Sequence, residues 1–160
     1  MRAGHFKAHA TGSNLGAWTV VGNGDVATVS TTYTSRGCAF NAKKGLAFLD
    51  LTGLCDCGAA SGIAQSVATT PDASYTLKFW VGNTFIRGGA GTECTVNVYN
   101  GTTLLTSATN DHGRHVKTQV WRKFSVTFTV TDTSTSLSFI NSDQPGNINC
   151  GLDEVKLEAN

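Results

Sequence analysis

The chain has 160 residues, of which 40% are hydrophobic and 14% charged, with a formal net charge of +1. This composition predicts a globular protein, and the length is typical of a single domain covering residues 1–160. The longest cationic run is Lys43-Lys44, so the chain lacks the basic surface that nucleic-acid binding requires. It also lacks an apolar run of about 18 residues, which excludes a membrane-spanning helix.

Short alternating or apolar runs, separated by Gly, Asn, Asp and Pro, predict strands along the chain. In order they cover residues 26–31, 46–51, 62–69, 75–81, 94–99, 103–108, 123–130, 136–142 and 152–158. Asn100-Gly101 separates two of these runs and predicts a hairpin. No stretch has sustained helical periodicity. The pattern therefore predicts an all-β fold, either a sandwich or a barrel.

Alternation along each run predicts which side chains face the core. Phe124, Val126, Phe128 and Val130 share one face of their run, and Cys94, Val96 and Val98 share one face of another. Two sheets that press such faces together would bury a core.

Trp80 breaks the alternation, because a core position for Phe79 turns this indole outward. The same parity turns outward Lys78, Asn97, Tyr99, Lys123 and Thr127. If these strands share a sheet, an aromatic ring framed by amides, hydroxyls and ammonium groups suits a sugar, which has an apolar C–H face and a fringe of hydroxyls. The alternative is that a loop covers Trp80, or that a bulge turns it towards a second core.

Five segments resemble, in the expected order, the galactose-binding-like jelly-roll modules that bind carbohydrates. They are AWTVVGNGDVATVS, GLAFLDLTG, GIAQSVATTPDASYTLKFWVGN, WRKFSVTFTVTDTSTSLSFINS and NCGLDEVKLE. The plant cell-wall proteins grouped as domain of unknown function 642, with their bacterial choice-of-anchor relatives, are closest in style. The resemblance implies a two-sheet antiparallel β-sandwich with jelly-roll topology, secreted, with polysaccharide partners and no established catalytic chemistry.

The five cysteines add two expectations. Cys94 and Cys150 match a cysteine pair of the plant proteins, so the resemblance implies a disulfide between them. We expect Cys38 to pair with either Cys55 or Cys57, because zinc needs four ligands and a bridge between Cys55 and Cys57 would be strained. Disulfides indicate an extracellular protein, either a monomer or part of a larger secreted chain.

The resemblance also implies a candidate structural calcium site at Asp153, completed by an early loop near Lys43-Lys44. The first-strand position where relatives carry an acid is Lys7 here, and a cation cannot ligate calcium. We therefore expect the Lys7 ammonium group to replace the ion and pair with Asp153. No cofactor is required under this hypothesis.

The sequence favours a non-catalytic module that binds cell-wall polysaccharide through Trp80 and its neighbours. The first alternative is a structural or adhesive extracellular domain with protein partners. The second is an enzyme with an unrecognised site, for which His112 and His115, close to Asp111, are the candidates. No known nucleophile, metalloprotease or nucleotide-binding motif supports the enzyme alternative.

Overall fold

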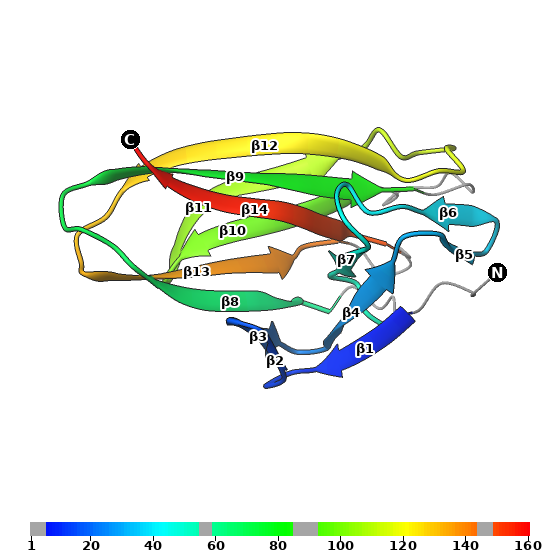
Figure 1. Cartoon of the computed structure of the whole chain (residues 1–160), viewed down its shortest axis with the longest axis horizontal. Coiled ribbons are helices and arrows are strands. Elements are labelled where there is room, and N and C mark those ends of the chain that lie inside the picture. Colours follow the sequence, from blue (N-terminus) through cyan, green and yellow to red (C-terminus); the bar gives the residue numbers. More distant parts are fainter. Residues whose placement is uncertain (1–5, 55–58, 85–92, 144–148) are drawn as a thin grey trace.

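The computed structural model describes residues 6–54, 59–84, 93–143 and 149–160. These residues form two six-stranded antiparallel sheets and a two-stranded hairpin (Figure 1). The first sheet has the order β1 (Phe6–Ala10), β4 (Asp25–Ser30), β7 (Ala47–Asp50), β14 (Gly151–Ala159), β9 (Ser74–Asn83) and β12 (Val120–Thr129). The second sheet has the order β11 (Thr103–Asn110), β10 (Cys94–Asn100), β13 (Ser134–Asn141), β8 (Ser61–Ala68), β3 (Trp18–Gly22) and β2 (Asn14–Leu15).

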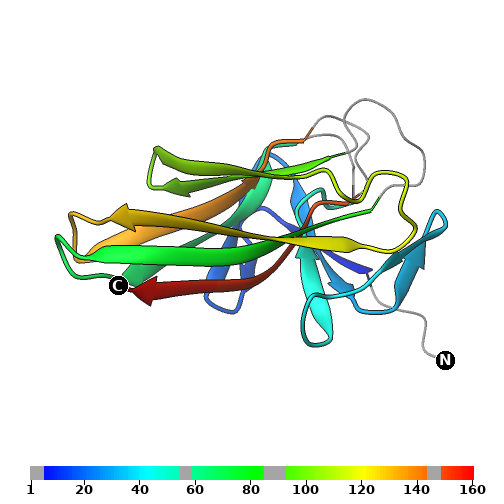
Figure 2. The ribbon, with the colours of Figure 1, turned by 90° about the horizontal axis from the view of Figure 1, so that it is seen from above.

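The two sheets pack face to face, which confirms the predicted all-β jelly-roll sandwich. Figure 2 shows the long strands β9, β12 and β14 side by side, and the C-terminal end of β14 lies far from the hairpin of β5 (Tyr33–Ser35) and β6 (Cys38–Phe40). Neighbouring strands are often distant in sequence, as where β14 pairs with both β7 and β9. The described residues contain no helix that is long and apolar enough to cross a bilayer.

The core lies where the alternating faces meet. Phe79 is fully buried; its ring stacks on Phe124 at 5.9 Å and meets Phe139 edge-on at 5.2 Å. Cys94, Val96 and Val98 are fully buried, and Phe124, Val126 and Phe128 pack against the same cluster. Period-2 alternation therefore predicted these facing residues correctly.

The predicted hairpin at Asn100-Gly101 is also present. Asn100 pairs with Thr103 across it, and Gly101 adopts a φ of 58°, a left-handed conformation that glycine reaches without a steric penalty.

A second, smaller core lies on the outer face of the first sheet. It is covered by the hairpin of β5 (Tyr33–Ser35) and β6 (Cys38–Phe40), whose strands fall outside the predicted runs. Phe40 and Phe48 are buried there, and the Trp121 ring meets Phe48 edge-on at 5.4 Å. The Trp121 indole N–H donates to the carbonyl of Asn41 at 2.8 Å. The hairpin therefore covers this part of the outer face, and Trp121 is structural.

Candidate functional site

An apolar cavity of about 330 Å³ lies between the two sheets, near the edge formed by β2 and β3. Its lining comes from both sheets: Leu15, Trp18 and Ile63 from the second, and Thr28, Ala47, Phe48, Leu49, Leu152, Asp153 and Val155 from the first. The volume is within the range of small-molecule sites, about 300–1,000 Å³. We call this space the Trp18 cavity.

Trp18 forms the aromatic wall of the cavity and is itself held in place. Its ring meets Phe139 edge-on, with the ring centroids 5.8 Å apart. Leu15 on the edge strand β2 pairs with Trp18, and both are partly buried. A rigid indole beside aliphatic side chains offers a flat apolar surface on which another ring can stack.

Thr28 contributes a hydroxyl group to this otherwise apolar wall. It pairs with Leu49 on β7, and paired residues project to the same face of an antiparallel sheet. The Thr28 hydroxyl is 2.9 Å from the Nε2 atom of His9 on the neighbouring strand β1. The sequence does not indicate that either residue belongs to a site, because threonines are common in the strands and His9 has no acid nearby in the chain.

Asp153 borders the Trp18 cavity, but its carboxylate belongs to the opposite face of the sheet. Asp153 pairs with Trp80, whose neighbours Phe79 and Val81 are both fully buried in the core. One carboxylate oxygen accepts hydrogen bonds from the backbone N–H groups of Lys43 at 2.9 Å and Lys44 at 3.1 Å. The other oxygen accepts a hydrogen bond from the backbone N–H of Glu154. This carboxylate therefore ties the segment before β7 to the outer face.

These donors bear on the predicted calcium site. Calcium binds oxygen ligands, whereas N–H groups stabilise a carboxylate in place of a cation. The geometry at Asp153 does not fit the site implied by the resemblance, and calcium binding there stays a prediction. The expected partner Lys7 lies on β1 opposite Thr28, and the described residues show no ion pair between Lys7 and Asp153.

The residues predicted to bind a glycan are divided between two sheets. Lys78, Trp80 and Lys123 do meet on the outer face of the first sheet, in a shallow depression of about 150 Å³. Thr127 is on the same face, hydrogen-bonded to Thr76 at 3.0 Å. Asn97 and Tyr99 are on β10 of the second sheet, so the single polar face on which the hypothesis depended does not exist.

Trp80 itself is partly covered. The Lys43 ammonium group lies 4.0 Å from the centre of its ring, a cation–π contact. The rest of the depression is charged rather than apolar, since Glu154, Lys156 and Glu158 complete its lining. The alternative in which Trp80 is covered is thus partly correct, although the cover is a lysine side chain.

The depression contains one perturbed carboxyl group. Lys78 donates a hydrogen bond to Glu158 at 2.5 Å, and this bond and the lysine charge lower the pKa of Glu158 below its ordinary value. A lowered carboxyl pKa stabilises the fold above the group's ordinary titration range, and this contribution is lost as the pH falls through the lowered value.

Replacing Lys78 with methionine is therefore expected to raise the pKa of Glu158 towards its ordinary value. The measurement is a carbon-13 NMR titration of the Glu158 carboxyl. Lys44→Met is the matched control, because Lys44 lies 3.9 Å from Glu154 instead. Identical Glu158 titration curves in wild type and Lys78→Met would contradict the assignment.

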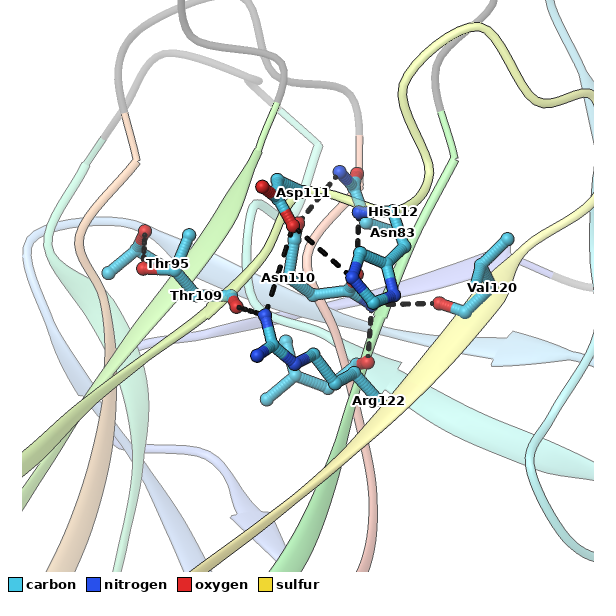
Figure 3. A network of polar contacts seen from close by, with 9 residues as sticks. Asn83, Thr95, Thr109, Asn110, Asp111, His112, Val120 and Arg122 are labelled. Atoms are coloured by element: carbon cyan, nitrogen blue, oxygen red, sulfur yellow. Dashed lines mark hydrogen bonds and ion pairs between the residues drawn. The ribbon is translucent and has the colours of Figure 1, made fainter.

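His112 and His115 occupy an exposed turn after β11 and do not enclose a site. The Nε2 atom of His112 is 3.6 Å from the Asp111 carboxylate, which also lies 3.8 Å from the Arg122 guanidinium. Figure 3 shows these groups around Asn110, whose side-chain amide donates to the carbonyls of Val81 and Val120. His115 is exposed, with a φ of 62°. The network anchors the turn, and both histidines are exposed there.

The structure joins Cys94 to Cys150 and leaves the buried thiol of Cys38 free. A bridge from Cys38 to Cys55 or Cys57 is therefore not formed, because β6 points Cys38 into the second core beside Phe40. Cys55 and Cys57 lie outside the described residues. Asp143 lies close to the sulfurs of Cys94 and Cys150, but these three residues do not suit a metal ion. The Asp143 carboxylate accepts a hydrogen bond from the backbone N–H of Thr95, and the sulfurs are bonded to each other. The extracellular location stays a prediction.

The fold and the cavity together define a β-sandwich protein with a small apolar site between its sheets. A family model described as HpiC1-like, HpiC1 cyclase, matches residues 2–158. The chain belongs to this family of cyclases. No match is found among curated proteins.

Solved structures of similar fold include cyclases from Fischerella sp. TAU. A Stig cyclase, Fisc, in complex with (3Z)-3-(1-methyl-2-pyrrolidinylidene)-3H-indole is 16% identical with a TM-score of 0.66, over 100% of this chain and 90% of that chain. A second cyclase, in complex with 4-(1H-indol-3-yl)butan-2-one, is 18% identical with a TM-score of 0.58, over 97% and 84%. A family 35 carbohydrate-binding module from an environmental isolate is 17% identical with a TM-score of 0.52, over 82% and 89%.

The family assignment corrects several expectations. The resemblance to carbohydrate-binding modules and to domain of unknown function 642 identified the fold but not the family. The predictions of a non-catalytic module, of polysaccharide partners and of a cell-wall role were wrong, and the enzyme alternative fits better. The physical reason is that the matching segments are core strands, which both groups share, whereas function resides in the sites carried by a fold.

Proposed function

We propose that this chain is a cyclase that closes a ring within a small, mainly apolar substrate held in the Trp18 cavity. The observation that carries the proposal is the apolar cavity of about 330 Å³ between the sheets of a chain that belongs to a cyclase family. The Trp80 depression is instead lined mainly by charged side chains, and His112 and His115 lie on an exposed turn.

The proposed substrate carries an indole ring with a short apolar substituent. Two cyclases of similar fold have indole compounds bound, which supports this choice. The indole would lie against Trp18, and the substituent against aliphatic side chains such as Leu49, Leu152 and Val155. Such contacts contribute through buried apolar area and ring packing.

The cavity would accelerate ring closure mainly by restricting the substrate. Holding the two reacting carbons in contact removes conformational entropy before the reaction, an effect worth up to about 7–11 kcal/mol in well-oriented intramolecular cases. The side chains of Trp18, Leu15 and Ile63 would cover part of the substrate with apolar surface. Because closure within one molecule rearranges bonds without loss of atoms, the product has the mass of the substrate.

Filling the cavity is expected to weaken binding and to reduce turnover. Leu15→Trp places a second indole at the edge of the Trp18 cavity, and Leu104→Trp makes the same change at an exposed leucine on β11. We use 4-(1H-indol-3-yl)butan-2-one, called the indole ketone below, as the binding probe. We expect Leu15→Trp to weaken its binding at least about tenfold, which is a loss of about 1.4 kcal/mol of binding free energy. Leu104→Trp should bind as wild type does.

Calorimetric titration measures the binding, and thermal melting shows whether each variant is folded. Turnover is assayed with a panel of 3-alkenylindoles, and products of unchanged mass are identified by NMR. Wild-type protein that neither binds the indole ketone nor converts any alkenylindole would overturn the proposed function. Equal binding by a folded Leu15→Trp variant would move the site away from the Trp18 cavity.

A further inference from the structure

The Trp18 cavity has a hydroxyl group in its wall with a histidine behind it. Thr28 lines the cavity, and its Oγ1 atom is 2.9 Å from the Nε2 atom of His9. Both side chains are partly buried, and β1 is an edge strand of its sheet. The pair therefore connects the apolar interior with an imidazole close to solvent.

The sheet register fixes this arrangement. Lys7 is directly opposite Thr28, and His9 is directly opposite Val26, so His9 reaches Thr28 along the diagonal of the same face. Thr28 is in turn opposite Leu49, which lines the cavity. A shift of one residue in the β1–β4 register would turn His9 to the other face, away from Thr28, whose own face is fixed by its pairing with Leu49.

We propose that Thr28 is a catalytic residue of ring closure and that His9 is the positioning residue that exchanges protons through it; this inference rests on the proposed function. In the first step the Thr28 hydroxyl gives its proton to a basic atom of the substrate and takes one from the His9 imidazolium. After ring closure, the cyclised cation loses a proton to the Thr28 oxygen, which passes its own proton to the neutral His9 imidazole. The protein ends as it began, and no oxidant or reductant is consumed.

The other described residues around the cavity offer no second group for this proton exchange. Asp153 is the other polar residue in the described lining, and its carboxylate is held on the opposite face by the N–H groups of Lys43 and Lys44. Lys7 is the charged group that shares the His9 face of β1, and β4 presents the uncharged Val26 and Thr28 to it. Among the described residues, the cavity lining from β2, β3, β7 and β8 contributes no titratable side chain.

Removal of the hydroxyl is the first test. Thr28→Val keeps the shape of the side chain, so the indole ketone should bind with unchanged affinity while kcat falls about 100-fold, the lower end of general acid–base effects. Thr28→Ser should recover most of the lost rate. Thr127→Val, on the outer face of the first sheet, is the matched control and should keep wild-type kcat.

Removal of the proton exchange is the second test. His9→Gln retains a hydrogen-bonding group for Thr28 but cannot take up a proton near neutral pH. We expect kcat to fall about tenfold with KM unchanged, because the side chain that exchanges protons with Thr28 is lost while substrate binding is not. His112→Gln is the control for histidine loss at the exposed turn and should keep the wild-type kcat and KM.

The third test is an NMR measurement that needs no turnover. When the indole ketone is labelled with carbon-13 at its carbonyl, a hydrogen bond from Thr28 shifts the bound signal downfield. Thr28→Val should remove that shift, and Thr127→Val should not.

Two results would overturn the inference and leave the proposed function standing: full kcat in Thr28→Val with normal probe binding, or loss of activity in His112→Gln together with full activity in His9→Gln. Absence of both probe binding and turnover in wild type would instead overturn the proposed function, and the inference with it.

Discussion

Replacement of both Cys94 and Cys150 with alanine is expected to lower the free energy of unfolding by about 4 kcal/mol, the chain-entropy value for a closed loop of this length. The disulfide spans a sequence separation of 56 residues, and both cysteines are fully buried. It ties β10 of the second sheet to the residue just before β14 of the first, so the bond holds the two layers together. Urea unfolding followed by tryptophan fluorescence measures the loss.

Cys38→Ala is the matched control for this double variant. It removes a buried sulfur from the second core without breaking a covalent link, and should cost about 1 kcal/mol. Reduction of wild type should reproduce the loss seen in the double variant. An unfolding free energy that is the same with and without reductant would show that the bond contributes nothing to stability.

Phe79→Ala is expected to destabilise the protein by about 3–5 kcal/mol, as other truncations of buried aromatic residues do. Phe79 lies at the centre of the sandwich, in contact with Phe124 from its own sheet and Phe139 from the other. Phe139 also supports Trp18, so the cavity left at position 79 should loosen the aromatic wall of the candidate site.

Phe128→Ala provides the comparison, because Phe128 is on the same face of β12 as Phe124 but is only partly buried. Its loss should be clearly smaller than that of Phe79→Ala. Indole ketone affinity measured on both variants would separate loss of packing from loss of binding. A Phe79→Ala protein within about 1 kcal/mol of wild type would place Phe79 outside the essential core.

Proton transfer in this molecule would depend on an edge strand. β1 holds five residues and pairs with β4 alone, yet it supplies His9 to the hydroxyl at the cavity wall. Edge strands open more readily than central strands, because fewer buried contacts hold them. The stability of β1 is thus expected to control activity more than overall stability does, and hydrogen exchange at Lys7 and His9 would report it.

Local sequence patterns were sufficient to predict much of the fold. Alternation placed Phe124, Val126 and Phe128 on the core face, and the Asn100-Gly101 turn was correctly predicted. These features depend on neighbours one or two residues apart, so a single chain contains them. The short β5–β6 hairpin escaped prediction because Tyr33–Ser35 and Cys38–Phe40 are too brief to show a period.

The candidate site depended on pairings across the whole chain. One cavity is lined by residues from β3, β4, β7 and β14, namely Trp18, Thr28, Leu49 and Leu152. No local sequence pattern indicates that these strands come together. The Trp80 prediction failed for the same reason, since parity gave the correct face of β9 but could not show that Asn97 and Tyr99 belong to the other sheet.

The sequence by itself therefore determined the fold class, the core-facing side chains of the main strands and the turn between β10 and β11, because each follows from side-chain alternation and local backbone preference. The tertiary structure alone decided which sheet each strand joins, that Cys38 stays unbridged and where Thr28 comes within reach of His9. The physical reason is that strand order and register arise from long-range packing of the complete chain, whereas period-2 alternation is the same for every partner a strand could have.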